Sequence, residues 1–463
     1  MPLVDQDSIS LSHAADGPWP TVPSALGFET EKTIKSRRFK RHLVAALPRF
    51  ARPGGITDRE IGPTSYLDAL RGYAAVCVFI AHSFNTFGDN WRREPLISFL
   101  FHGSSMVALF FVISGYVLSY RLLIYIRKQE FERLISSLAS STFRRYVRLY
   151  GSTECACFIA MIMVRFKIYP GCRPPMYKDT FWEQLVDWGW DLVYFSNPFG
   201  DIRGWPSSFD SRYLDQMWSI PAEYRGSVAI FAFCTAACRL TTRSRMVLTW
   251  VIIVACYIWQ AIYVAEFMAG LFIADLSLSR HPERLDNPRS LTGPHHHHKQ
   301  QTLWEKVGYG CLFVLGIFIL GEPDDTTMGI MGTFPWEFLK RFIPGWWDDS
   351  GNYLFWLGIG AFMLVYALEF YPTLQKPLNW RYSQYIGDLS FGIYAMHVPL
   401  ALGPYFQVMI PLREQYLGGW PVIKYIPGLI AYPLMVLIAA DYFERVDKQV
   451  IRFARWLQTK LFV

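Results

Sequence analysis

The sequence has few charged residues and lacks the short signals of a secreted or soluble enzyme. Only 18% of its 463 residues are charged, whereas 52% are hydrophobic and 17% aromatic. A soluble chain ordinarily carries about 25% charged residues. The opening segment, MPLVDQDSISLSHAADG, has no apolar stretch of the kind that secretory signals contain, and the sequence has no Asn-X-Ser/Thr sequon. Soluble multi-domain architectures are therefore disfavoured, and a membrane protein is favoured.

The sequence also lacks the patterns of several chemical centres. Its eight cysteines lie mostly within apolar runs, and the pairs Cys155/Cys157 and Cys234/Cys238 do not have zinc-site spacing. We therefore expect no metal site, and we interpret the four histidines at 295–298 as part of a low-complexity insert. No G-X-S-X-G nucleophile motif is evident, so a covalent acyl-enzyme is not indicated.

Long apolar runs are what the sequence does contain, and they predict an all-α, polytopic integral membrane protein. Each run is long enough to cross about 30 Å of hydrocarbon, except the sixth, which is short. The prediction is about ten transmembrane helices, at 65–87, 104–126, 146–166, 222–238, 246–264, 265–278, 304–320, 353–371, 384–404 and 421–442.

Lys and Arg residues gather in alternate loops, which predicts that both termini are cytosolic. The expected organisation is a largely disordered basic tail (1–64), a transmembrane domain (65–442) and a C-terminal tail (443–463). Within the domain, a Trp-rich non-cytosolic loop spans about 167–221, and a cytosolic insert spans about 279–303. The tryptophans of the loop form either an aromatic belt at the headgroups or a cap over a substrate chamber.

The first span, 65-SYLDALRGYAAVCVFIAHSF-84, carries three groups that hydrocarbon penalises: Asp68, Arg71 and His82. Arg71 and His82 are eleven residues apart, close to three helical turns, so they lie on one face about 16 Å apart. Asp68 is three residues before Arg71 and is expected to pair with it. His82 alone is compatible with either a functional base or a neutral core histidine.

The order of further motifs resembles the acyltransferase 3 family of polytopic membrane O-acyltransferases. Arg-X10-His in the first span is followed roughly thirty residues later by 110-FFVISGY-116. The later matches are Arg145-X-X-Arg148, 218-WSIPAEY-224, the glycine-bearing 267-FMAGLFIAD-275 and 389-LSFGIYAMHVPL-400. The resemblance covers about residues 65–440. The long tail and Trp-rich loop are more like those of eukaryotic, including fungal, members.

The resemblance implies transfer of an acyl group from acyl-CoA to a hydroxyl, and the residue chemistry agrees. Histidine suits the removal of a hydroxyl proton because its pKa lies near ambient pH. An arginine cluster at what we take to be a helix start suits the donor's phosphates. The expected site comprises catalytic His82, Arg71, Glu223 and Tyr116, donor-binding Arg144, Arg145, Arg148, Ser114 and Gly115, and supporting Asp68, Trp218, Ser390, Tyr394 and His397.

Several roles stay open from the sequence alone. Ser114, Tyr116 and Arg71 are each candidates to stabilise charge on the thioester oxygen. Glu223 either orients His82 or forms a buried pair with an arginine, and His397 is either part of the polar network or a core histidine. His102 departs from the family pattern, and we interpret it as a surface residue.

The expected partners are acyl-CoA, with acetyl-CoA as the foremost donor, a hydroxyl acceptor and the lipid bilayer. The acceptor class is a small natural product, a sugar or glycan, or a lipid. No tightly bound cofactor and no nucleic acid are expected, and the membrane is an endomembrane or the plasma membrane. The alternatives are a proton-coupled transporter, which the absence of similarity between the two halves disfavours, and an inactive relative.

Overall fold

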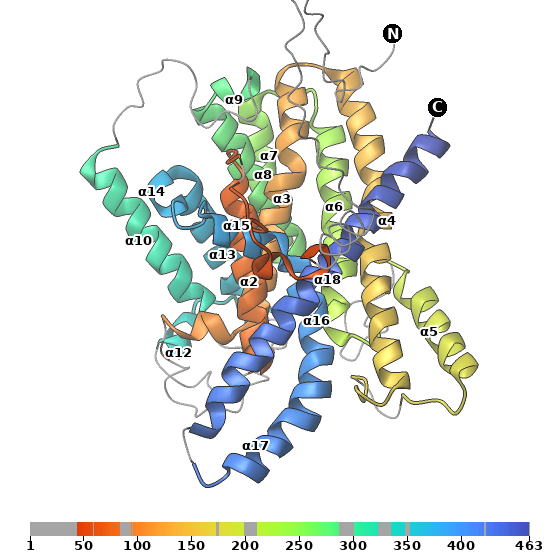
Figure 1. The fold of residues 1–463 in the computed structure, drawn as a ribbon. Helices are drawn as coiled ribbons and strands as arrows, with labels where there is room; N and C mark the ends of the chain where they lie inside the picture. Colours follow the sequence, from red (N-terminus) through yellow and green to blue (C-terminus); the bar gives the residue numbers. More distant parts are fainter. Residues whose placement is uncertain are drawn as a thin grey trace, which may run out of the picture. The chain divides into compact units, whose positions relative to one another are not determined.

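The computed structural model is helical throughout the part of the chain that it describes (Figure 1). All helices from Arg49 onward belong to the unit formed by residues 48–463. The all-α prediction is confirmed for the described ranges, which are 44–58, 60–83, 94, 96–172, 176–198, 211–286, 301–322, 335–347, 352–420 and 423–462.

The longer helices provide the framework, and short helical turns link or flank them. The longer helices are α2 (Ser65–Ser83), α3 (Gly103–Arg127), α4 (Phe131–Arg165), α5 (Phe181–Phe195), α6 (Ser219–Ala236), α7 (Thr242–Ile258), α8 (Ile262–Arg280), α10 (Leu303–Leu320), α13 (Leu354–Phe370), α16 (Ser390–Leu400) and α18 (Ile426–Leu461). The shorter ones are η1 (Arg49–Ala51), η3 (Ser98–Phe101), η4 (Asp215–Trp218), α9 (Glu283–Asp286), α12 (Trp336–Lys340), α14 (Pro372–Gln375), α15 (Arg381–Asp388), η6 (Ala401–Met409), α17 (Ile410–Leu417) and η7 (Ile423–Tyr425).

Six helical segments in the described ranges are long and apolar enough to cross a membrane, whereas about ten spans were predicted. They are Gly103–Arg127, Phe131–Arg165, Ile262–Arg280, Leu303–Leu320, Ser390–Leu417 and Ile423–Leu461, with Leu354–Phe370 as a shorter apolar helix. Helix α2 falls outside this set because Asp68, Arg71 and His82 lower its hydropathy. The side of the membrane on which each terminus lies stays a prediction.

Helix boundaries differ from the predicted spans mainly where charged residues continue a helix. Helix α4 begins at Phe131 instead of near residue 146, and α18 runs on to Leu461, through the segment expected to be a tail. Charged side chains lower hydropathy without breaking a helix, so hydropathy alone underestimates helix length. The ninth predicted span is divided, because α15 ends at Asp388 and α16 begins at Ser390.

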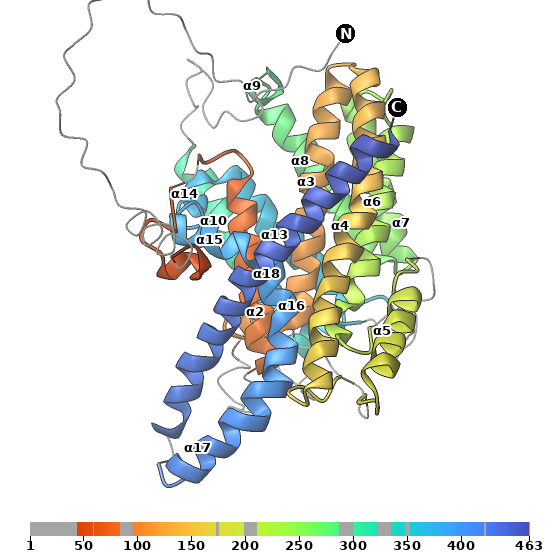
Figure 2. The same ribbon diagram turned by 45° about the vertical axis from the view of Figure 1, so that its right-hand side comes forward.

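Helix α2 contacts α3, α15 and α16, and glycines let two helix pairs around the site approach closely (Figure 2). A Cβ added to Gly72 of α2 would lie 2.5 Å from the backbone nitrogen of Gly387 in α15. A Cβ on Gly270 of α8 would lie 2.0 Å from the carbonyl oxygen of Val112 in α3. Larger residues at these positions would push the helices apart, so the small residues set the distances between the helices around the site.

Part of the segment expected to be a disordered tail is anchored to the helices. Arg49 donates from Nε to Asp441 Oδ1 at 2.8 Å, and its Nη1 lies 3.1 Å from Asp388 Oδ2. The guanidinium also lies 4.9 Å from the ring centre of Tyr385. The tail is therefore held from about residue 48 onward, whereas residues 1–43 lie outside the described residues.

The predicted loop at 167–221 contains the amphipathic helix α5, which packs against α4. Trp182 and Trp190 of this helix are exposed, which fits the belt interpretation. Trp218, at the end of the loop, instead lines an internal cavity. The belt and the cap interpretations of this loop both stay predictions.

Candidate active site

Arg71 lines a small cavity between α2, α3, α6 and α16, which we call the arginine chamber. Its volume is about 40 Å³, and its walls include Arg71, Phe110, Ser219, Glu223 and Ser390. The chamber is polar on the α2 and α6 sides and aromatic on the α3 side. It brings together residues that lie far apart in the sequence, as the motif order suggested.

His82 lines a second, larger cavity, which we call the histidine chamber. Its volume is about 200 Å³, and its polar and aromatic walls include His82, His102, Ser104, Gln216, Trp218, Glu322 and Tyr353. The His82 side chain is exposed to this chamber although α2 is otherwise mostly buried. A Cβ placed on Gly103 would lie 3.9 Å from His82 Nε2, so this nitrogen faces the start of α3.

The two chambers adjoin, because Val107 and Tyr394 line both of them. The Tyr394 hydroxyl lies 2.7 Å from Ser219 Oγ and also donates to the carbonyl oxygen of Gln216. These bonds hold the tyrosine ring at the boundary. The prediction that Arg71 and His82 share one face of α2 agrees with this geometry, since each side chain enters one of two neighbouring cavities.

Glu223 forms a pair with an arginine, which is one of the two alternatives left open. Its Oε1 accepts from Arg145 Nη2 at 2.6 Å and from Ser114 Oγ at 3.0 Å. Arg145 also donates from Nε to Ser227 Oγ at 2.9 Å. These charge-assisted bonds join α3, α4 and α6 beside the arginine chamber.

Positive charge around this chamber exceeds the negative charge. Within the described residues, neither Arg71 nor Arg148 forms an ion pair or hydrogen bond, so the predicted Asp68–Arg71 pair is not present. Arg148 is close enough to Arg71 and Arg145 to be repelled by both, while Glu223 and Asp447 attract it. Uncompensated guanidinium groups beside a cavity favour an anionic ligand.

Arg144 lies apart from the other two arginines of its cluster. It experiences repulsion from Arg455 of α18 and Arg121 of α3 instead. The three arginines at 144, 145 and 148 also do not lie at a helix start, because α4 begins at Phe131. The helix-dipole argument for them was wrong, since the dipole acts only over the first turn.

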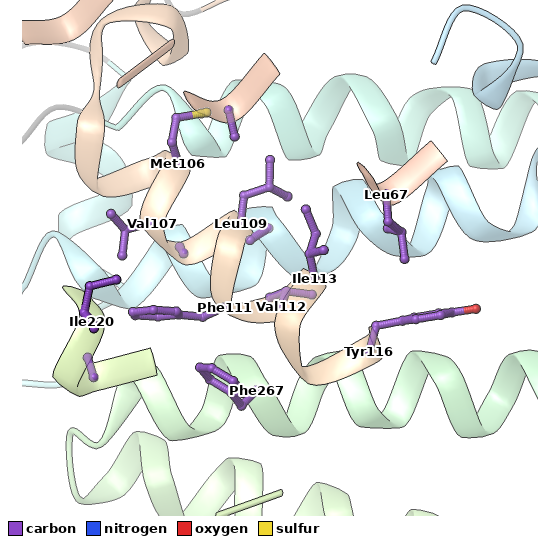
Figure 3. Packing of buried hydrophobic residues seen from close by; sticks show 14 of the residues in the cluster. Leu67, Met106, Val107, Leu109, Phe111, Val112, Ile113, Tyr116, Ile220 and Phe267 are labelled. Carbon is purple, nitrogen blue, oxygen red and sulfur yellow. The ribbon is translucent and has the colours of Figure 1, made fainter. Parts of the chain in front are cut away.

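Gly115 and Tyr116 face away from both chambers, contrary to the roles assigned to them. A Cβ on Gly115 would lie 2.0 Å from the carbonyl oxygen of Phe267, so this glycine serves the packing of α3 on α8. Tyr116 is fully buried and projects away from Val107 along α3 (Figure 3). Its neighbours are Glu369 and Arg284, which with Tyr66 and Ser277 form a network that we call the Glu369 network.

His397 is completely buried beside His82, with 5.3 Å between the ring centres. Its Nδ1 lies 3.1 Å from the carbonyl oxygen of Ile393, one helical turn earlier. It is therefore both buried in the core and next to the predicted base. The remaining supporting residues, Ser390, Tyr394 and Trp218, all line a chamber.

The interpretation of His102 as a surface residue was wrong, because it is 5% exposed and lines the histidine chamber. Sequence reasoning also missed Gln216, Glu322 and Tyr353, which reach this chamber from three separate segments. Spacing within one segment cannot reveal such contacts between segments. Gln216 could have been noticed, since it lies two residues before Trp218 of a recognised motif. The tetra-histidine at 295–298 lies outside the described residues.

Comparison with known proteins identifies the family to which this chain belongs. A family model described as an acyltransferase domain, Acyl_transf_3, matches residues 64–445. The chain belongs to the acyltransferase 3 family. The resemblance inferred from the motifs is thereby confirmed, and the family and the relatives support an acyltransferase. No solved structure matches it.

Three fungal proteins are similar to this chain over most of their length. O-acetyltransferase PaAT-1 of Phomopsis amygdali is 29% identical over 93% of this chain and 91% of its own. Acyltransferase R4 of a Phoma species is 22% identical over 74% and 84% of the two chains. Acyltransferase clz18 of Cochliobolus lunatus is 22% identical over 73% and 83%. The similarity to these relatives supports the interpretation of this chain as a fungal O-acyltransferase.

Proposed function

We propose that this acyltransferase transfers an acyl group, foremost acetyl, from acyl-CoA to a hydroxyl of a small natural product, sugar or lipid. One observation carries the proposal: an arginine-lined cavity adjoins a histidine-lined cavity through the shared residues Val107 and Tyr394. The first suits an anionic donor, and the second offers a base. The similarity to a protein named as an O-acetyltransferase supports acetyl as the group transferred.

The donor would bind along a series of arginines from four helices, α2, α3, α4 and α18. Arg144 is repelled by both Arg121 and Arg455, and these three guanidinium groups suit the nucleotide phosphates. Arg148 and Arg71 then continue toward the arginine chamber. This order would lead the thioester past Tyr394 to His82 while the phosphates stay at the outer arginines.

The transfer itself requires one base and one site for developing negative charge. The acceptor oxygen attacks the thioester carbonyl carbon, its proton passes to His82, the carbon–sulfur bond breaks, and His82 returns the proton to the CoA thiolate. Helix α3 begins at Gly103 beside His82 without a side-chain cap, so its first amide groups are candidate donors to the thioester oxygen. This start of α3 replaces Tyr116 in that role.

The acceptor would occupy the histidine chamber. Trp218, Tyr353 and Phe101 offer aromatic faces, and His102 and Glu322 add polar groups. A mixed lining of this kind suits a compact molecule with both apolar and hydroxyl-bearing parts. We infer a multi-pass location in an endomembrane or the plasma membrane.

The test is replacement of His82 in the full-length protein, purified in detergent and supplied with acetyl-CoA. Metabolite profiling with and without the gene first identifies the acceptor as a mass difference of one acyl group. His82→Ala should then lower acyl transfer at least about 100-fold, as loss of a general base typically does. Binding of radiolabelled acetyl-CoA and the melting temperature should change little.

The matched control is His281→Ala, because His281 lies at the end of α8 outside both chambers. This variant should retain full activity. Normal turnover by folded His82→Ala protein would refute the assignment of the base. Failure of the wild-type protein to bind acetyl-CoA would refute the donor.

A further inference from the structure

His397 is a buried imidazole with a defined orientation. Its Nδ1 is 3.1 Å from the carbonyl oxygen of Ile393, and a carbonyl oxygen only accepts hydrogen bonds. Nδ1 must therefore carry the proton, which leaves Nε2 of the neutral ring as an acceptor. Within the described residues, Nε2 has no hydrogen-bond partner, although His397 is 0% exposed. A buried acceptor without a partner is costly and calls for an explanation.

The neighbouring ring is His82, the proposed base. The two ring centres are 5.3 Å apart with 35° between the planes, a separation that allows a nitrogen of each ring to come within hydrogen-bond distance when the His82 ring rotates. The backbone around His397 is held in place, because its carbonyl oxygen accepts from Tyr432 at 3.0 Å. Tyr432 in turn accepts from Ser83, the residue after His82, at 3.1 Å. These bonds tie the two histidine-bearing segments together.

We propose that His397 is a positioning residue for His82, whose protonated ring donates a hydrogen bond to His397 Nε2 during acyl transfer. This inference rests on the proposed function and deepens it. When the acceptor hydroxyl gives its proton to one nitrogen of His82, the N–H on the other nitrogen becomes a stronger donor. His397 accepts that bond without itself being protonated, and His82 then returns the proton to the CoA thiolate. The roles match those of a base and its orienting partner.

The proposal predicts a change in the pH at which His82 becomes protonated. An acceptor for His82 stabilises its charged form, so removal of His397 should shift that midpoint to lower pH. Among the residues that the structure describes, the other titratable or charged groups around His82 are Asp215, His102, Glu322, Tyr353 and Tyr394. All of them remain when residue 397 is replaced, so a change in the protonation midpoint of His82 can be attributed to the loss of His397.

The test measures the reaction of His82 with diethyl pyrocarbonate across pH, because this reagent reacts with a histidine side chain only in its neutral form. The full-length protein in nanodiscs is compared as wild type, His397→Leu and His397→Gln, with modification of His82 read by peptide mass spectrometry. His397→Leu should lower the midpoint by roughly 0.5–1 pH unit. His397→Gln offers a carbonyl oxygen of similar reach, so its midpoint should lie close to that of the wild type. His281 serves as an internal reference that should not move.

Kinetics provide a second measurement. His397→Leu should lower kcat about tenfold with an unchanged KM for acetyl-CoA, and His397→Gln should recover much of the loss. Equal midpoints in all three proteins would overturn the proposal, as would equal losses in Leu and Gln. If His397→Leu does not accumulate, His397→Asn replaces it, since its shorter side chain does not reach His82. Because the chemical modification needs no acceptor, its result stands even if the donor or acceptor is assigned wrongly.

Discussion

Two polar clusters flank helix α3, and they differ in how their charges are balanced. The Glu369 network is enclosed: Glu369 accepts from Tyr66 at 2.7 Å, from Ser277 at 2.6 Å and from Arg284 at 2.7 Å. Each of its two charged groups has a partner of opposite sign. The cluster at the arginine chamber is open: Glu223 pairs with Arg145, while Arg71 and Arg148 form no ion pair among the described residues.

The difference in charge balance indicates a structural role for the closed Glu369 network and a ligand-binding role for the open cluster at the arginine chamber. A closed network satisfies buried groups and fixes helices, and it leaves nothing for a ligand to bind. An excess of guanidinium groups beside a cavity is costly unless an anion binds there. The open cluster is therefore where a donor with phosphate groups is expected. The closed one ties α2, α8, α9 and α13 together.

The largest change in donor binding is expected from the open cluster. Arg71→Gln and Arg148→Gln should each weaken binding of radiolabelled acetyl-CoA at least about tenfold, because each removes a positive charge next to the proposed donor site. Melting temperatures should stay the same or rise, since repulsion among the arginines falls. The measurement is a Kd by filter binding at two salt concentrations.

The control for these variants is Arg243→Gln, an exposed residue of α7 that lines neither chamber. It should leave the Kd unchanged. Equal affinities for wild type, Arg71→Gln and Arg148→Gln would mean that these arginines do not bind the donor and only help to orient the protein in the membrane.

Substitution in the closed Glu369 network should lower stability and leave the affinity for acetyl-CoA unchanged. Arg284→Gln leaves the Glu369 carboxylate buried without its cation, which typically costs about 3 kcal/mol. The melting temperature should fall clearly, while the folded fraction binds acetyl-CoA with normal affinity. Replacing both Arg284 and Glu369 by Gln should recover part of the stability, because no uncompensated charge then remains. A weakened Kd at full stability would make this network part of the donor site.

Helical spacing accounts for most of what the sequence predicted correctly. Arg71 and His82 are separated by about three turns, and each enters one of two adjoining cavities. Ser114 lines neither cavity but donates to Glu223, which lines the arginine chamber. Contacts inside one helix follow from periodicity alone. The resemblance to the acyltransferase 3 family rested on short sequence motifs, which explains why it was found without a structure.

The wrong assignments have equally simple physical reasons. Residues two apart in a helix point about 160° from one another, so Ser114 and Tyr116 could not both have faced the donor. The start of α4 was misplaced because charged residues at 144–148 were taken as a boundary. His102, Gln216 and Glu322 come together only through packing between segments, which no local pattern contains. Sequence spacing therefore predicts which residues share one face of a helix. Only the tertiary structure shows which other segments pack against that face.

The smallest effect is expected at Tyr116, and its matched partner is Tyr394. Tyr116→Phe removes a hydroxyl beside the Glu369 network, far along α3 from Val107, so kcat and KM should stay within about twofold of wild type. Tyr394→Phe removes the bonds to Ser219 and to the carbonyl oxygen of Gln216 at the boundary of the chambers. Its kcat should fall about tenfold, because the ring that separates donor from acceptor is no longer held. Measuring both variants with acetyl-CoA and the identified acceptor decides which tyrosine serves acyl transfer. A large loss in Tyr116→Phe with normal Tyr394→Phe would reverse the assignment and place the reacting thioester on the opposite side of α3.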